Sequence, residues 1–265
     1  MRNLETQFFQ QGWCRFPRDP LVEDWVSGAL AAARATLDDP EQAQWHRCQG
    51  TWFAGVNALP NREDSSLDGQ EPLQGEVIDF IRSQLALDGF AWDRGQVSVC
   101  FPGYPKATPG ESPGRSRFRR EQDAAHVDGL LPEGEQRRRH FREGHGFVLG
   151  LPMVDFAADA APFVAWEKSH ELIRVALRQR FRGIEASLWG EEDITEAYHA
   201  ARDRVFETCR RVEIHARPGE AFLVHRLMLH GTAPWRDGAE AGADGRMICF
   251  FRPDVLSAEE WLNSP

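Results

Sequence analysis

The fold and the chemistry of this chain are organised around Ala125-His126-Val127-Asp128-Gly129. In a β-strand, successive side chains point to opposite faces, so residues two apart share a face. We therefore expect the imidazole of His126 and the carboxylate of Asp128 to reach the same point in space. An isolated His-x-Asp pair occurs by chance in many chains, so its meaning depends on the residues that accompany it.

A third ligand can come from Leu229-His230-Gly231-Thr232, because His230 lies 104 positions after His126 (230 − 126). Two histidines and one carboxylate on one face of a metal ion leave the opposite face open, and this is the facial triad of non-haem Fe(II) oxygenases. His225, five residues before His230, competes with it for the third place.

Composition limits the class of protein. A chain of 265 residues that is 42% hydrophobic can bury a proper core. Thirty-one basic against 41 acidic residues give a net charge of −10, which argues against a nucleic-acid or membrane-surface protein. Five scattered cysteines without a C-x-x-C pair favour reduced thiols. Because the first residues lack the apolar run of a signal peptide and no stretch approaches a membrane span, we expect a cytoplasmic protein.

The first 94 residues are expected to be mostly helical. Residues 12–16 alternate as a short strand, and apolar residues at helical spacing predict helices over 21–37 and around 77–85. Residues 45–69 are polar with scattered aromatic side chains and show no assignable pattern.

Short strands dominate from residue 95 onward. Strands are predicted at 97–101, 146–154, 162–166, 212–215, 221–225 and 246–251, and further helices at 169–177 and 194–205. Ser257 and Glu260 form a possible capping box. The arginine-rich residues 106–122 and 137–142 are expected to be loops.

Helices followed by a succession of strands predict a mainly β protein with flanking helices and a double-stranded β-helix core, a cupin-like jelly roll. We expect one domain over residues 1–265, with 1–94 as mostly helical support and 95–256 as the jelly-roll core.

Four features together resemble the phytanoyl-CoA dioxygenase (PhyH) family of Fe(II)/2-oxoglutarate-dependent oxygenases. They are His126-x-Asp128, residues 163–170 ending in a Ser-His pair, residues 217–232 ending in His-Gly-Thr, and Arg246 at the start of the next strand. Two departures are that Glu167-Lys168 replaces the family's usual Pro-Gly, and that the loop over 234–245 is longer.

The resemblance implies that His126, Asp128 and His230 hold Fe(II), and it favours His230 over His225 because Gly-Thr follows His230. It also implies that 2-oxoglutarate, used together with O2, chelates the metal through its C1 carboxylate and keto oxygen.

The far carboxylate of 2-oxoglutarate would then reach Arg246 and Thr232. A buried guanidinium needs a partner, and a carboxylate matches its fork. Arg252, on the same side of the strand, is the alternative anchor.

The implied activity is that of a dioxygenase that hydroxylates a small molecule at an unactivated C–H bond with release of succinate and CO2. Asp128 favours hydroxylation, because halogenating relatives have a non-coordinating small residue there, while desaturation and ring closure stay open. The alternatives are a jelly roll that uses another divalent metal for non-oxidative chemistry and a barrel that only binds a ligand.

Two groups of side chains have both a structural and a functional interpretation. Ser169 and His170 are more typical of a helix start than of a site. The arginines within 115–120 and 137–142 are typical of solvated loops, and the alternative is a mobile lid that captures an anionic substrate. The oligomeric state is not indicated by the sequence.

Overall fold

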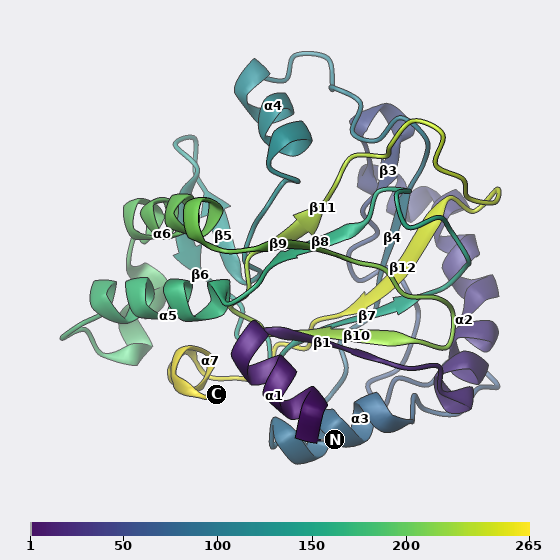
Figure 1. Cartoon of the computed structure of the whole chain (residues 1–265), viewed down its shortest axis with the longest axis horizontal. Coiled ribbons are helices and arrows are strands. Elements are labelled where there is room, and N and C mark those ends of the chain that lie inside the picture. The colour runs from purple at the N-terminus through teal and green to yellow at the C-terminus, as the bar shows by residue number, and fades with distance from the viewer. Residues whose placement is uncertain (1) are drawn as a thin grey trace.

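The computed structural model describes residues 2–265 and contains two facing antiparallel sheets (Figure 1). The larger sheet has seven strands in the order β1 (Trp13–Phe16), β10 (Ala221–Val224), β7 (Val148–Pro152), β12 (Arg246–Phe251), β4 (Gln96–Cys100), β3 (Trp52–Phe53) and β2 (His46–Arg47). The smaller sheet has the order β11 (His230–Thr232), β8 (Phe163–Trp166) and β9 (Arg211–Ile214). Residues 1–94 thus contribute three strands as well as helices.

An apolar core fills the space between the two sheets. Ile248 and Phe250 of β12 and Phe222 of β10 pack there against Phe163 of β8. The alternate residues of β12, beginning with Met247, belong to a different cluster on the outer face of the larger sheet. This two-sheet arrangement confirms the predicted jelly roll.

Helices cover the outer face of the larger sheet. α2 (Pro20–Asp38) and α3 (Glu76–Gln84) lie against it, and α1 (Arg2–Gln11) precedes β1 (Figure 1). α2 begins where the sequence predicts, because the Asp19 carboxylate caps its first turn and Pro20 takes a position that needs no N–H donor.

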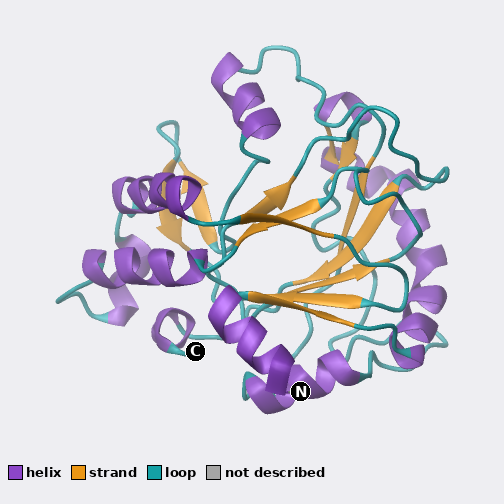
Figure 2. Ribbon diagram, in the orientation of Figure 1, coloured by secondary structure: helices purple, strands orange, loops and turns teal. Residues whose placement is uncertain are grey.

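A second group of helices lies beyond the smaller sheet (Figure 2). It comprises α5 (Ser169–Arg180), η3 (Ala186–Glu191), α6 (Thr195–Thr208) and α7 (Ala258–Asn263), with the hairpin of β5 (Leu130–Glu133) and β6 (Arg138–Phe141) beside them. The predicted capping box of Ser257 and Glu260 is present at α7. No helix within residues 2–265 is both long and apolar enough to cross a membrane.

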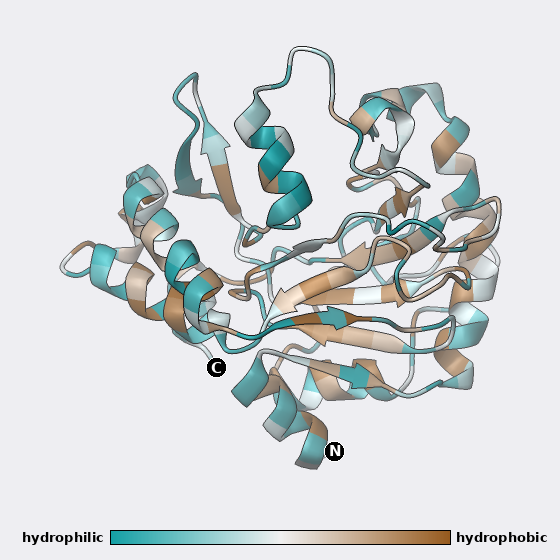
Figure 3. Ribbon diagram, turned by 45° about the horizontal axis from the view of Figure 1, so that its top comes forward, coloured by the Kyte–Doolittle hydropathy of each residue, from teal (hydrophilic) through white to brown (hydrophobic). Residues whose placement is uncertain are grey.

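Two of the expected loops are wrong. Residues 106–122 contain α4 (Pro113–Glu121), which stands apart above β11 and is largely hydrophilic (Figures 1 and 3). The Ser112 hydroxyl caps α4, and arginine is a good helix former. Residues 137–142 contain β6, which forms a hairpin with β5.

The unassigned residues 45–69 fold into short elements beside the larger sheet. η1 (Pro40–Trp45) and η2 (Cys48–Gly50) flank β2, and β2 pairs with β3. β3 in turn pairs with β4, so this segment extends the larger sheet at its edge.

Candidate metal centre

The two histidines lie opposite each other across an isolated β-bridge. The amide of His126 donates to the carbonyl of His230 at 2.8 Å, and the amide of His230 donates back at 3.0 Å. This pairing joins two segments that are about a hundred residues apart in sequence. Asp128 follows two residues after His126, in the turn that leads from this bridge into β5.

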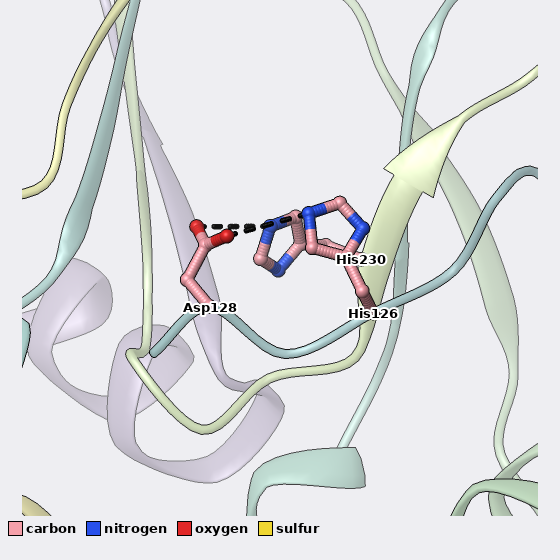
Figure 4. A group of neighbouring side chains, drawn as sticks. All are labelled: His126, Asp128 and His230. Carbon is pink, nitrogen blue, oxygen red and sulfur yellow. Dashed lines mark ion pairs between the residues drawn. The ribbon is translucent and has the colours of Figure 1, made fainter. Parts of the chain in front are cut away.

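One donor atom from each of His126, Asp128 and His230 lies within 4.8 Å of the other two (Figure 4). The Nε2 atom of His126 is 3.3 Å from Oδ1 of Asp128, and that of His230 is 3.4 Å from Oδ2. Two ligands placed about 2.1 Å from a metal and at right angles would be about 3 Å apart. The spacing therefore fits a common ion.

Backbone carbonyls determine which imidazole nitrogen faces Asp128. Nδ1 of His126 lies 3.0 Å from the carbonyl of Ala124, and Nδ1 of His230 lies 2.9 Å from that of Met228. A carbonyl accepts only, so each Nδ1 carries the proton and donates it. Each Nε2 is then the nitrogen that faces Asp128, and it binds a metal when it gives up its proton.

Asp128 is ionised although its side chain is only 6% exposed. Burial by itself would raise the pKa of this carboxyl, but Arg252 and the two histidines outweigh burial and hold the pKa well below its usual range. Nη1 of Arg252 lies 3.1 Å from Oδ1 of Asp128. The donor set is therefore the Nε2 atoms of two imidazoles and one carboxylate, which a neighbouring guanidinium keeps ionised.

Two glycines allow the ligand segments to come this close. A Cβ on Gly231 would lie 2.2 Å from the carbonyl oxygen of Asp123, and one on Gly129 would lie 2.2 Å from that of Glu143. Gly129 also has a φ of +79°, which side chains rarely adopt. The glycines that follow Asp128 and His230 are thus required by the packing of the backbone.

A cavity of about 240 Å³ opens onto the three ligands. Its walls are mostly aromatic and aliphatic, and its polar lining includes two arginines. The lining residues outside the ligands are Trp45, Arg47, Trp52, Ala54, Val56, Gln96, Ser98, Val148, Phe163, Gly231, Thr232, Phe250 and Arg252.

The candidate anchors for a co-substrate differ in position. Thr232 and Arg252 line the cavity, and Arg252 is already bound to Asp128. Arg246 is fully buried beside Cys100 and Tyr104 and is not among the lining residues. It shares the inward face of β12 with Phe250 and Arg252. Burial lowers the pKa of Arg246, and within residues 2–265 none of its three guanidinium nitrogens has a hydrogen-bond partner.

The remaining candidates lie away from the cavity. His225 is buried against His170 and Arg174, and these three residues line a separate hollow that contains none of the ligands. His170 faces the carbonyl of Phe9. Ser169 begins α5 as expected, but its hydroxyl accepts a hydrogen bond from the amide of Leu229, next to His230, and so supports the ligand loop.

Two buried arginines also connect the loop that carries His230 to the end of α7. Arg226 is buried and donates to four carbonyls at the end of α7, those of Glu260, Trp261, Ser264 and Pro265. Arg174 donates to two of the same segment, those of Leu262 and Ser264. Carbonyls that a helix end leaves without partners are thereby satisfied by two cations.

The sequence did not reveal Trp45, Arg47 and Trp52 as part of the site. They reach the cavity because β2 and β3 extend the larger sheet, and a two-residue strand is too short to show a period. The aromatic residues among polar neighbours were the only signal in that segment.

Comparison with known proteins supports the fold. No protein-family model and no curated protein matches the chain. Among solved structures, EctD from S. alaskensis with 2-oxoglutarate and 5-hydroxyectoine aligns with a TM-score of 0.52 at 13% identity, over 97% of this chain and 77% of that one. The epimerase SnoN in complex with Fe³⁺, α-ketoglutarate and nogalamycin RO aligns with a TM-score of 0.51 at 14% identity, over 100% and 89%. At such identities the likeness shows a shared fold.

Proposed function

We propose that this protein is an Fe(II)- and 2-oxoglutarate-dependent oxygenase of the PhyH type that acts on a small molecule. The observation that carries the proposal is the convergence of His126, Asp128 and His230 at one cavity, with both Nε2 atoms directed at an ionised carboxylate. The structures of EctD and SnoN, which share the fold, hold 2-oxoglutarate, and that of SnoN also holds iron.

The residues of the chain fit this pair of cofactors. Two imidazoles and one carboxylate leave half of the coordination sphere of Fe(II) to the co-substrate and O2. Arg246, with a buried guanidinium that lacks a protein partner, is the proposed anchor for the far carboxylate of 2-oxoglutarate, with Thr232 as a further donor. Arg252 is the less suitable anchor because it is committed to Asp128.

When bound, Fe(II) with 2-oxoglutarate supplies the oxidation of a C–H bond by O2, with release of succinate and CO2. The protein keeps both imidazoles in the metal-binding tautomer, keeps Asp128 ionised through Arg252, and limits water through the apolar cavity wall. We propose hydroxylation as the outcome, because Asp128 occupies the position that halogenating relatives leave free of a ligand.

The test is anaerobic addition of Fe(II) and 2-oxoglutarate to the apo-protein, followed by visible spectroscopy and then by a succinate assay after O2 is admitted. We expect a weak charge-transfer band that needs both components, and succinate only after O2. A jelly roll that uses another metal for non-oxidative chemistry would give neither, and a barrel that only binds a ligand would retain its binding when Asp128 is replaced by alanine.

A further inference from the structure

The cavity at the metal ligands is too small to be the whole substrate site. Its volume of about 240 Å³ lies below the ~300–1,000 Å³ of ordinary small-molecule pockets. A second hollow of about 660 Å³ adjoins it, and the two share Arg47 and Trp52 in their walls. A molecule that enters the inner cavity can therefore extend past these two side chains into the outer groove.

The outer groove lies between the β2–β3 hairpin and α4. On the hairpin side it is lined by Arg47, and on the other side by Arg115 and Arg119 of α4. Residues four apart on a helix share a face, so Arg115 and Arg119 point to the groove together. α4 is the hydrophilic helix that stands above β11 (Figures 1 and 3).

Only part of this positive charge is neutralised within the protein. Arg119 is paired with Glu111, the one carboxylate in the groove wall, and that pair is largely shielded from solvent. Arg47 and Arg115 form no ion pair within the described residues. Arg47 is instead positioned by its β2 pairing with Trp52 and by stacking over Trp45, 5.3 Å from the ring centroid.

This positive groove contrasts with the chain as a whole and with the other basic stretch. The protein carries a net charge of −10. In the basic stretch 137–142, Arg138 is matched by Asp193 and Glu196, and Arg142 by Glu133. Arg47 and Arg115, two cations without a carboxylate partner, therefore both line the outer groove that adjoins the candidate metal centre.

We propose that the outer groove binds an oxyanion of the substrate, a carboxylate or a phosphate, between Arg47 and Arg115. The apolar body of the same molecule lies in the inner cavity against Trp52 and Phe250, which directs a C–H bond to the metal ligands. The substrate is thus an elongated amphiphile with an apolar end and an anionic end. This inference rests on the proposed function, because the inner cavity is the oxygenase site.

The test compares ω-phenylalkanoates of three to eight carbons, and the matching phosphate esters, with their neutral amides and alcohols. Binding is measured by calorimetry under nitrogen on protein already loaded with Fe(II) and 2-oxoglutarate. We expect the anionic probe of at least one chain length to bind ten times or more tightly than its neutral counterpart, and added NaCl to reduce this ratio. Preference for carboxylate or for phosphate identifies the oxyanion.

Single substitutions of arginine by glutamine test which positive charges bind the oxyanion. Arg47→Gln and Arg115→Gln are each expected to lower the ratio at least threefold, and the double variant to abolish it. Arg117→Gln and Arg120→Gln change the same helix by the same charge outside the groove, so they are expected to leave the ratio unchanged. Equal losses in all four variants would show a diffuse field and overturn the proposal, as would a panel in which no anion is preferred.

The two proposals can fail separately. If the charge-transfer band of the Fe(II)·2-oxoglutarate complex does not form, the oxygenase itself is refuted. If the band forms and no probe shows a charge preference, only the oxyanion groove is refuted.

Discussion

Replacing Arg246 by methionine is expected to stabilise the protein without ligands and to destroy its response to 2-oxoglutarate. The guanidinium is fully buried, and no protein atom among the described residues accepts a hydrogen bond from it. A buried charge without a partner costs several kcal/mol, and methionine keeps most of the volume. We expect Arg246→Met to raise the free energy of unfolding of the apo-protein by about 2 kcal/mol, or roughly 4–8 °C in Tm.

The ligand response is expected to change in the opposite direction. A carboxylate bound to both prongs of a guanidinium contributes about 1.5–3 kcal/mol per hydrogen bond, so its loss weakens 2-oxoglutarate binding by 100-fold or more. At a 2-oxoglutarate concentration of 100 Kd, the wild-type protein gains about 2.7 kcal/mol, and the variant about 0.4 kcal/mol or less.

The assay is thermal unfolding with Mn²⁺ as a redox-inert metal, with and without 2-oxoglutarate. Arg226→Met is the matched control, because Arg226 is equally buried but donates to four carbonyls. Its replacement is expected to lower stability by about 3 kcal/mol or more while 2-oxoglutarate still raises the Tm. The reasoning is refuted if Arg246→Met destabilises the apo-protein as Arg226→Met does, or if it retains the full 2-oxoglutarate shift.

Three further predictions concern the metal ligands, their packing and pH. Alanine at His126, Asp128 or His230 is expected to weaken Mn²⁺ binding at least 100-fold in calorimetry with little loss of fold, and unchanged binding would remove that residue from the ligand set. Gly231→Ala is expected to weaken Mn²⁺ binding, because its Cβ would lie 2.2 Å from a backbone oxygen. Gly242→Ala is the control and is expected to leave Mn²⁺ binding unchanged, because its Cβ would have no atom within 4 Å. Burial raises the pKa of Asp93 to about 6. The folded state therefore holds a proton that the unfolded state releases near pH 4, so this residue lowers stability as pH rises from about 4 to 6, by on the order of 2–3 kcal/mol. In urea titrations at several pH values, Asp93→Asn is expected to reduce this pH dependence of the free energy of unfolding. The same pH dependence in the wild-type protein and the variant would contradict the prediction.

Most of the strands and the long helices could be predicted from the sequence because their periods are local. β12 is a continuous run of six buried residues, five of them apolar, and α2 combines a capping Asp19, a leading proline and an apolar stripe. The His-x-Asp pair and His-Gly-Thr likewise carry their pattern within a few residues. The structure brings both to one point through a bridge that only the fold supplies.

The elements that were mispredicted depend on long-range contacts or on a signal that composition obscured. α4 begins with Ser112 and Pro113, which is a helix start, but the surrounding glycines, prolines and arginines resemble a loop. β6 is a strand because it pairs with β5 and because Arg138 meets carboxylates more than fifty residues away. Arg47 becomes a cavity residue only when β3 joins β4. No window of sequence contains those partners.

The hydrogen bonds from Arg174 and Arg226 to the end of α7 should slow the local opening of this segment. A terminal segment usually frays, and its amide protons then exchange with solvent within seconds to minutes. Here, opening of residues 260–265 would leave Arg226 without its four acceptors, and Arg174 without two of its own, beside the loop that carries His230. The amides of Trp261 and Ser264 should therefore exchange with deuterium as slowly as those of the central strands. Opening of residues 260–265 should also weaken metal binding by His230.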